Sequence, residues 1–209
     1  CYNLAMIKAV IFDLNGVFLE SKLLSERFKE KYGVPEEKFV PALKTVMDIV
    51  RKPNSPSAFS LWKPYLDKWG INLTEKKFFD FWFSGEKLVL GLVHYVDELK
   101  DKGLKIFILS NNLKERTENY RKQFPDFFNK FDGAYFSWET GLVKPDTKAY
   151  EKILAENGLR PKECIYFDDS DKNIEVARSL GIQAEKYESL EITKTAIEKL
   201  TSPKAFKRK

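Results

Sequence analysis

IKAVIFDLNGV, residues Ile7–Val17, is a stretch in which an apolar run ends abruptly in a carboxylate, an amide and a glycine. A short β-branched run of this kind is typical of a strand buried in a parallel sheet. Asp13 would then lie at the carboxyl edge of the sheet, where open α/β folds build their sites. An unpaired buried charge is costly, so Asp13 is a candidate functional residue. The alternative is that it caps the next helix or is held by loop amides.

Three later segments place further polar side chains where an apolar strand ends or a loop follows. LKIFILSNN ends in Ser110 and Asn111, ECIYFDDSDKN carries Asp168 and Asp169, and GLVKPDTKAY supplies Lys144 ahead of a helix. Carboxylates from two strand ends can hold a divalent cation, and magnesium favours one or two carboxylates plus waters and phosphate oxygens. A hydroxyl and a lysine can bind a phosphate. Each segment alone is a weak signal, whereas all four in this order form a strong one.

The motifs DLNGV, SNN, KPD and DDS resemble those of the haloacid dehalogenase (HAD) superfamily, and they span the chain from Ile7 to about Gly181. Most members of that family are phosphatases that work through an aspartyl-phosphate. The pair Asp168 and Asp169 resembles the branch with sugar-phosphate phosphatases and the phosphatase domain of soluble epoxide hydrolase. The resemblance implies an α/β fold, with a Rossmann-like parallel sheet, helices on both faces and an inserted α-helical cap.

The resemblance also implies a magnesium site. By position, Asp13 would be both the nucleophile and a metal ligand. The backbone carbonyl of Asn15 would be a second ligand and the Asp169 carboxylate a third. Asp168 would lie in or just behind this set of ligands. The expected cofactor is therefore Mg²⁺.

The same comparison of motifs assigns the phosphate-binding groups. Ser110 and Lys144 would bind the phosphoryl group, and Lys144 would also take part in catalysis. Asn111 would border the substrate. Asn173 stands where many relatives carry another acid.

Asn15 departs from the pattern of the family. Its phosphatases usually carry an aspartate at this position, which protonates the leaving group and then activates water. An amide can form hydrogen bonds but cannot carry a proton, and general acid–base catalysis is typically worth about 10²–10⁴ in rate. Turnover is therefore expected to be slow. Two explanations are open: a natural member with slow or water-assisted turnover, or an engineered change that traps a ligand.

The order and spacing of the apolar segments predict a core domain formed by residues 6–19 and 86–200, and a helical cap over 20–85. Alternating strands and helices imply a parallel, doubly wound sheet. The expected strands are Lys8–Leu14, Leu104–Leu109, Ala134–Ser137, Cys164–Phe167 and Gln183–Tyr187. The expected core helices are Glu86–Lys102, Leu113–Lys130, Asp146–Asn157, Lys172–Leu180 and Ile192–Leu200.

The predicted cap is rich in aromatic residues, most of which would form its own small core. One or two would face the active site, which the cap would cover, as lids commonly do. Arg51 and Lys63 are candidates to attract an anionic substrate, although solvation is the alternative for both. Substitutions at Trp62, Trp82 or Arg51 are expected to change the choice of substrate.

The overall charge does not point to nucleic acid. The net charge is +5, but the last nine residues hold four positive charges and no acids, and without them 32 basic and 31 acidic residues remain. A short charged tail over 201–209 is expected to be disordered.

Met6 reads as a natural start, and no membrane span or signal peptide is expected. Two cysteines, Cys1 and Cys164, favour a reducing cytoplasm.

The leading hypothesis is a magnesium-dependent phosphatase, a phosphoric monoester hydrolase, that acts on a small phosphorylated metabolite as a monomer or homodimer. One alternative is a hydrolase of the 2-haloacid dehalogenase type, since dehalogenases of this superfamily also lack the second aspartate. They need no metal, however, so Asp168 and Asp169 argue against it. Another alternative is a catalytically weak member that binds a ligand or partner, which rests on Asn15. The physiological substrate is not encoded in any motif of the cap.

Overall fold

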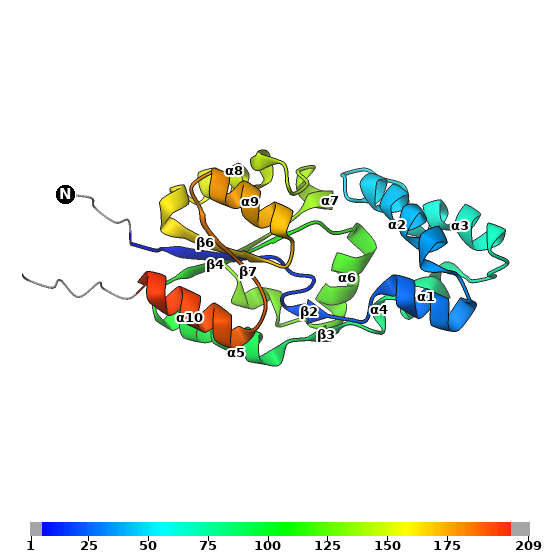
Figure 1. Ribbon diagram of the computed structural model, residues 1–209, viewed down its shortest axis with the longest axis horizontal. Coiled ribbons are helices and arrows are strands. Elements are labelled where there is room, and N and C mark those ends of the chain that lie inside the picture. Colours follow the sequence, from blue (N-terminus) through cyan, green and yellow to red (C-terminus); the bar gives the residue numbers. More distant parts are fainter. Residues whose placement is uncertain (1–5, 202–209) are drawn as a thin grey trace, which may run out of the picture.

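A five-stranded parallel sheet forms the centre of the computed structural model, which describes residues 6–201 (Figure 1). The strand order is β5-β4-β1-β6-β7, so the chain moves outward from β1 in both directions. All five expected strands are present, with ends that differ from the expected ones by at most two residues, and the predicted α/β class is confirmed. The strands are β1 (Ala9–Phe12), β4 (Lys105–Ser110), β5 (Gly133–Phe136), β6 (Cys164–Asp168) and β7 (Gln183–Lys186).

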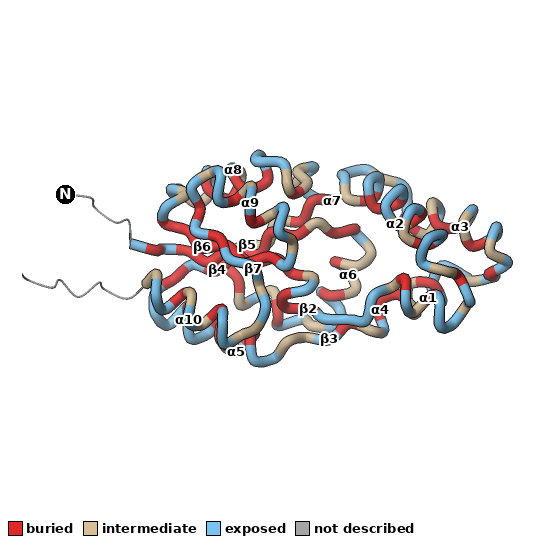
Figure 2. Tube along the Cα trace, viewed as in Figure 1, coloured by how far each residue is buried: buried red, intermediate tan, exposed pale blue. Residues whose placement is uncertain are grey.

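Alternation along the strands divides the core into two apolar layers, because successive side chains of a strand point to opposite faces. Val10 and Phe12 pack into one cluster with α5, α6 and α10. Ala9 and Ile11 pack into the other with α8 and α9. In Figure 1 these helices lie on opposite sides of the sheet, and Figure 2 shows the central strands between them as largely buried, whereas the edge strand β7 is mostly exposed. The helices are α5 (Leu90–Asp101), α6 (Lys114–Gln123), α8 (Thr147–Glu156), α9 (Asp171–Ser179) and α10 (Leu190–Thr201).

Two of the expected helices are shorter than the sequence pattern predicts. The helix expected over Leu113–Lys130 ends at Gln123, because the residue before a proline avoids helical geometry and Pro125 follows Phe124. A single 3₁₀ turn, η1 (Phe128–Lys130), comes later. The short elements α7 (Ser137–Thr140) and η2 (Pro161–Glu163) complete the core.

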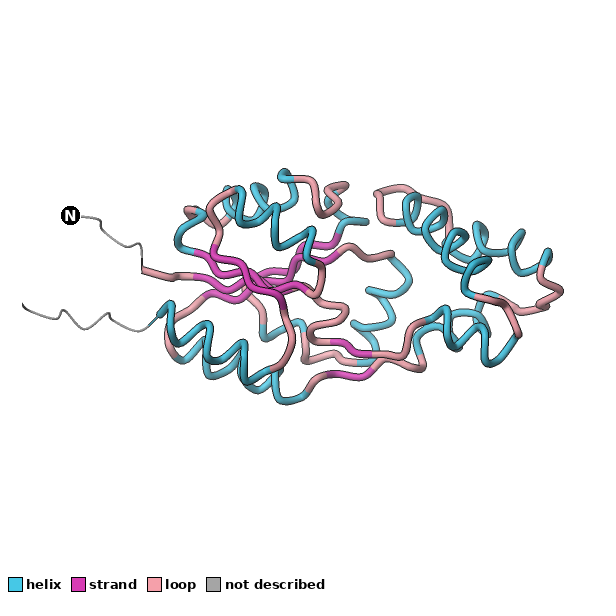
Figure 3. The backbone as a smooth tube through the Cα atoms, in the orientation of Figure 1, coloured by secondary structure: helices cyan, strands magenta, loops and turns pink. Residues whose placement is uncertain are grey.

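Residues 20–85 form four helices beside the core, in the range predicted for the cap, while the division into two domains stays a prediction. A short antiparallel pair, β2 (Leu19–Glu20) and β3 (Lys87–Leu88), lies where the chain leaves the core and returns to it (Figure 3). The expected helix from Glu86 therefore starts only at Leu90. Two-residue strands carry no periodic signal, so the sequence could not reveal this pair. The helices are α1 (Leu24–Tyr32), α2 (Glu36–Val50), α3 (Ala58–Lys68) and α4 (Glu75–Phe83).

The cap helices enclose an apolar cluster of their own. Trp62, Phe28, Phe39 and Phe78 are fully buried in it, as expected for most cap aromatics. Leu113, which precedes α6, inserts from the core into this cluster and joins the two parts.

Some expectations concern the ends of the chain. Cys1 and all of the expected basic tail except Thr201, the last residue of α10, lie outside the described residues. Cys164 is a free, buried thiol in β6. Among residues 6–201, no helix combines the length and the apolar character needed to cross a bilayer.

Candidate functional site

The carboxyl ends of the three central strands bring the predicted site residues together. Asp13 follows β1 directly, while Ser110 ends β4 and Asp168 ends β6. The last residue of β1 is in register with Ile108 on one side and Phe167 on the other, and the Asp13 N–H donates to the Phe167 carbonyl at 2.8 Å. All three residues are buried, with Asp13 the most exposed at 8%. The edge of the sheet is thus a buried polar site.

Lys144 joins the two aspartates. It lies in the loop between α7 and α8, with a side chain that is 1% exposed. Its Nζ lies 2.9 Å from Asp13 Oδ1 and donates to Asp168 Oδ2 at 2.7 Å and to the Tyr166 hydroxyl at 3.1 Å. A buried ammonium between two carboxylates is a compensated charge. One cation therefore holds the ends of β1 and β6 together.

Asn111 fixes the loop that carries this lysine. Its Nδ2 donates to the Lys144 carbonyl at 2.8 Å, and the Lys144 N–H donates to Asn111 Oδ1 at 2.8 Å. Both polar atoms of the amide are therefore engaged with the main chain. The side chain was expected to border the substrate, but its contacts favour a different role, which is to position Lys144.

Asp168 is the most heavily bonded carboxylate of the site. Besides Lys144, it accepts hydrogen bonds from the Tyr166 hydroxyl, from the Ser170 N–H at 2.8 Å and from Asn173 Nδ2 at 3.0 Å to each oxygen. Burial opposes its ionisation, but the charge and hydrogen bonds of Lys144 and these donors outweigh burial and lower the pKa of Asp168. With its lone pairs in use, Asp168 is suited to anchoring Lys144 rather than to binding a ligand directly.

Asp168 and two further carboxylates lie close together at this edge of the sheet. Asp13, Asp168 and Asp169 each place an oxygen within 4.8 Å of the others, and Asp169 is exposed. Burial raises the pKa of Asp13 to about 6, since the attraction of Lys144 only partly offsets the lost hydration and Asp168 adds repulsion. A divalent cation bound by Asp13 and Asp169 would stabilise the ionised form of Asp13. The donor set fits a hard cation such as Mg²⁺.

Gly16 lets Asp169 approach the loop after β1. A Cβ built on this glycine would lie 2.3 Å from Asp169 Oδ2. Its φ of +86° is also a conformation that residues with a Cβ rarely adopt. The absence of a side chain at Gly16 therefore allows the Asp169 carboxylate to lie against the backbone of the loop after Asp13.

Within residues 6–201, two uncharged polar side chains of the site have buried atoms without a hydrogen-bond partner. Ser110 Oγ is buried and makes no hydrogen bond. Asn15 Nδ2 donates to the Tyr120 hydroxyl at 2.8 Å, while its Oδ1 is buried and unpaired. Buried polar groups normally find partners. The free Ser110 hydroxyl therefore marks a place where a bound group could supply one.

Two tyrosines of the site were not predicted. Tyr166 lies two residues before Asp168, and the two-residue period of a strand puts both side chains on one face. That spacing could have revealed it. Tyr120 had no such signal, because its contact with Asn15 depends on how α6 packs against the loop after β1.

A cavity of about 280 Å³ separates the cap from the core. Trp82, Met47 and Arg51 line it from the cap, and Glu86 and Arg116 line it from the other side. The cavity therefore has walls from both parts of the chain and contains one of the two cations that were expected to attract an anion.

The other expected cation is engaged elsewhere. Lys63 forms an exposed ion pair with Asp67 one helical turn away. Trp62, expected to influence substrate choice, is fully buried in the cluster of the cap.

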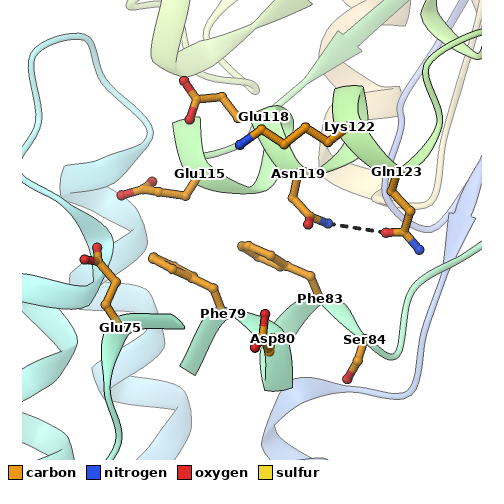
Figure 4. Close-up of a pocket in the computed structure, with 10 residues that line it drawn as sticks. All are labelled: Glu75, Phe79, Asp80, Phe83, Ser84, Glu115, Glu118, Asn119, Lys122 and Gln123. Carbon is orange, nitrogen blue, oxygen red and sulfur yellow. Dashed lines mark hydrogen bonds between the residues drawn. The ribbon is translucent and has the colours of Figure 1, made fainter. Parts of the chain in front are cut away.

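A second cavity, of about 550 Å³, lies between α4 and α6 (Figure 4). Phe79 and Phe83 stack along one wall, with ring centroids 5.3 Å apart, and Glu115 and Glu118 face them from α6. None of the strand-end residues described above lines it. They do not line the smaller cavity either, but its Arg116 lies over the ring of Tyr120, whose hydroxyl accepts a hydrogen bond from Asn15.

Comparisons with known proteins agree with this architecture. A family model described as haloacid dehalogenase-like hydrolase matches residues 7–181. Bifunctional epoxide hydrolase 2 of Sus scrofa is 26% identical over 93% of this chain, which spans only 39% of that relative. Phosphorylated carbohydrates phosphatase of Thermotoga maritima is 25% identical over 85% of this chain and 83% of its own.

A solved structure shows the same fold. A HAD family enzyme of Bacteroides thetaiotaomicron, in complex with magnesium and inorganic phosphate, has a TM-score of 0.75 at 24% identity. The match covers 88% of this chain and 96% of that one.

Proposed function

The chain belongs to the haloacid dehalogenase-like hydrolases, and we propose that it is a magnesium-dependent phosphatase acting on a small phosphorylated metabolite. One observation carries the proposal: Lys144 is held between Asp13 and Asp168, at the sheet edge where the Ser110 hydroxyl lacks a partner. An ammonium and a free hydroxyl beside a carboxylate are the groups that phosphoryl transfer needs. The phosphatase and magnesium–phosphate complex among the similar proteins support this choice over other hydrolyses.

Asp13 is the proposed nucleophile. Its carboxylate oxygen attacks phosphorus and forms an O–P bond, while the bond between phosphorus and the ester oxygen breaks. The electron pair of that bond leaves on the alkoxide, which takes a proton from water. Water then attacks phosphorus, which releases phosphate and restores Asp13. Lys144 offsets charge on the phosphoryl oxygens, and the Ser110 hydroxyl donates to one of them. Such positioning and neutralisation account for most of the catalysis of phosphoryl transfer.

Asp13, Asp169 and the backbone carbonyl of Asn15 are the proposed ligands of Mg²⁺. A bound Mg²⁺ would neutralise negative charge on the phosphoryl group and fix its orientation. Asp168 keeps Lys144 in place behind these ligands. We also propose that the protein works in a reducing cytoplasm, as the sequence led us to expect.

The alternatives differ in what they need from this site. A dehalogenase would need Asp13 but neither Asp169 nor a cation. A weakly catalytic binding protein is favoured by Asn15, whose amide is tied to Tyr120 and carries no proton.

A panel of phosphorylated metabolites, assayed for phosphate release with Mg²⁺ and again with a chelator, tests the proposal. We expect release that stops with the chelator and returns with Mg²⁺, and that is absent in Asp13→Ala. Asp67→Ala, which removes an exposed aspartate of the cap, is the matched control and should retain activity. Halide release from a 2-haloacid that ignores the chelator would instead support the dehalogenase.

A further inference from the structure

Arg51 is a half-buried arginine without a partner. It follows the last residue of α2 and lines the cavity between the cap and the core. Its Nε is buried and makes no hydrogen bond, and within residues 6–201 its side chain has neither a hydrogen bond nor an ion pair. A buried donor left unsatisfied, especially on a charged group, costs free energy. An anion that entered this cavity would remove that cost.

The other cations of the cavity are already satisfied or solvated. Arg116 pairs with Glu86, donating from Nε at 2.8 Å. Arg27 donates to main-chain carbonyls at the end of α4. Lys22 and Lys44 are exposed to water. The cations lining the cavity are Lys22, Arg27, Lys44, Arg51 and Arg116.

The cavity that Arg51 lines also approaches the catalytic end of the site. Burial lowers the pKa of Arg51, the Asp48 carboxylate counters this, Arg116 adds repulsion, and the Asp13 carboxylate attracts the guanidinium. Geometry gives the same direction: Arg116, in the wall of this cavity, lies 5.6 Å from the centroid of the Tyr120 ring, and the Tyr120 hydroxyl accepts from Asn15, two residues after Asp13. A ligand whose phosphoryl group is at Asp13 would extend toward Arg51.

The residues that line the cavity beside Arg51 indicate what the rest of such a ligand would be. Trp82, Met47 and Leu43 give the cavity an apolar side. Its volume of about 280 Å³ suits a ligand in which only a few atoms separate the two anionic groups. Apolar walls with one charged group are typical of sites that fix the orientation of a small molecule. Arginine also binds carboxylates and phosphates through two parallel hydrogen bonds.

We propose that Arg51 binds a second anionic group, a carboxylate or a phosphate, on the leaving group of the substrate. This inference rests on the proposed phosphatase function and narrows its substrates to small phosphomonoesters with a charged leaving group. Arg51 would select the substrate by holding the end remote from the bond that breaks.

Matched pairs of esters test this assignment. One pair differs by a carboxylate, phosphoglycolate against ethyl phosphate, and the other by a phosphate, fructose 1,6-bisphosphate against fructose 6-phosphate. We expect the wild-type protein to favour the charged member of one pair by about 10–100-fold in kcat/KM, as for a charge-assisted hydrogen bond. Whichever pair shows the preference identifies the anion.

Variants then assign the preference to the arginine. Arg51→Met should bring the ratio within the pair close to one, chiefly through KM, and Arg51→Lys should give an intermediate ratio because it keeps the charge without the planar fork. Lys63→Met removes a cap cation outside the cavity and should leave the ratio unchanged. An Arg51→Met ratio equal to that of the wild type, or no preference in either pair, overturns the inference while leaving the phosphatase proposal intact.

A binding measurement separates the two proposals if no ester is hydrolysed. Malonate and pyrophosphate should each be tested for a rise in Tm, since a ligand that binds only the folded state stabilises it. A rise that is lost in Arg51→Met and partly kept in Arg51→Lys supports the anion site without hydrolysis. Equal rises in all three proteins, or none in the wild type, count against it.

Discussion

The carboxyl edge of the sheet and the helical cap use their side chains in opposite ways. At the sheet edge, buried charges are paired with one another, as Lys144 is with Asp13 and Asp168. In the cap, aromatic and aliphatic side chains pack on one another in a cluster of their own, and the adjoining cavity is lined by an arginine without a partner. In the function proposed above, catalysis would therefore depend on paired polar groups, whereas substrate choice would depend on a charged side chain that the packing of the cap leaves without a partner.

The largest expected effect is at the edge of the sheet. Asp13→Ala removes the proposed nucleophile, and loss of a nucleophile elsewhere has cost on the order of 10⁶ in kcat. Asp168 and Tyr166 still hold Lys144 in the variant, so Tm should change little. Phosphate release and a thermal melt measure the two effects. Activity close to that of the wild type would refute the covalent mechanism.

The next largest effect is an expected gain in kcat from a substitution at Asn15, at the same edge of the sheet. Asn15→Asp should raise kcat by about 10²–10⁴, the usual worth of a positioned acid and base. The carboxylate can keep the contact with Tyr120, since a hydroxyl can donate as well as accept. The backbone carbonyl proposed as a metal ligand is unaffected by the change.

The leaving group provides the control for that gain. Alkyl phosphates need protonation as they leave and should gain more than activated aryl phosphates. The unmodified protein should also accumulate phospho-Asp13 if water activation is slow, which mass spectrometry can detect. An Asn15→Asp protein with the same rates and the same leaving-group dependence would mean that another group carries the proton or that the chain is not a phosphatase.

The two regions also differ in how far the sequence predicts them. Asp13, Ser110 and Asp168 were placed correctly at strand ends, because an apolar run that stops at a polar residue is a local pattern. The pairing of Asn15 with Tyr120 and the isolation of Arg51 were not predictable. Both depend on how separate segments pack against each other, which no periodicity records.

The role expected of Asn111 shows the same limit within the site. Its motif position next to Ser110 was read correctly as part of the sheet edge, but its amide turns to the Lys144 main chain. The direction of a side chain depends on its neighbours in space. Sequence therefore predicted which residues meet more reliably than what each one touches.

A smaller effect is expected at Tyr166. Tyr166→Phe removes the hydroxyl that accepts from Lys144 and donates to Asp168. Losing such a supporting contact around a metal site typically costs about 10–100-fold. We expect kcat to fall within that range and the Mg²⁺ concentration for half-maximal activity to rise.

Tyr150→Phe is the matched control, because its ring packs on Tyr166 but its hydroxyl donates to the Asn173 carbonyl and not to Asp168. It should change both quantities less. Equal losses in the two variants would show that packing, rather than the hydroxyl at Asp168, supports the site.

The smallest effect on catalysis is expected in the cap, at Trp62. Its side chain is fully buried among Phe28, Phe39 and Phe78, so it is now expected to stabilise the cap instead of selecting the substrate. Trp62→Ala should lower the free energy of unfolding by about 3–5 kcal/mol, measured by urea denaturation, with unchanged kcat on an aryl phosphate while folded. Trp69→Ala, at a half-buried position in the same cluster, should cost less. If Trp62→Ala changed substrate preference and left stability intact, packing and selection would not be separate properties of the cap.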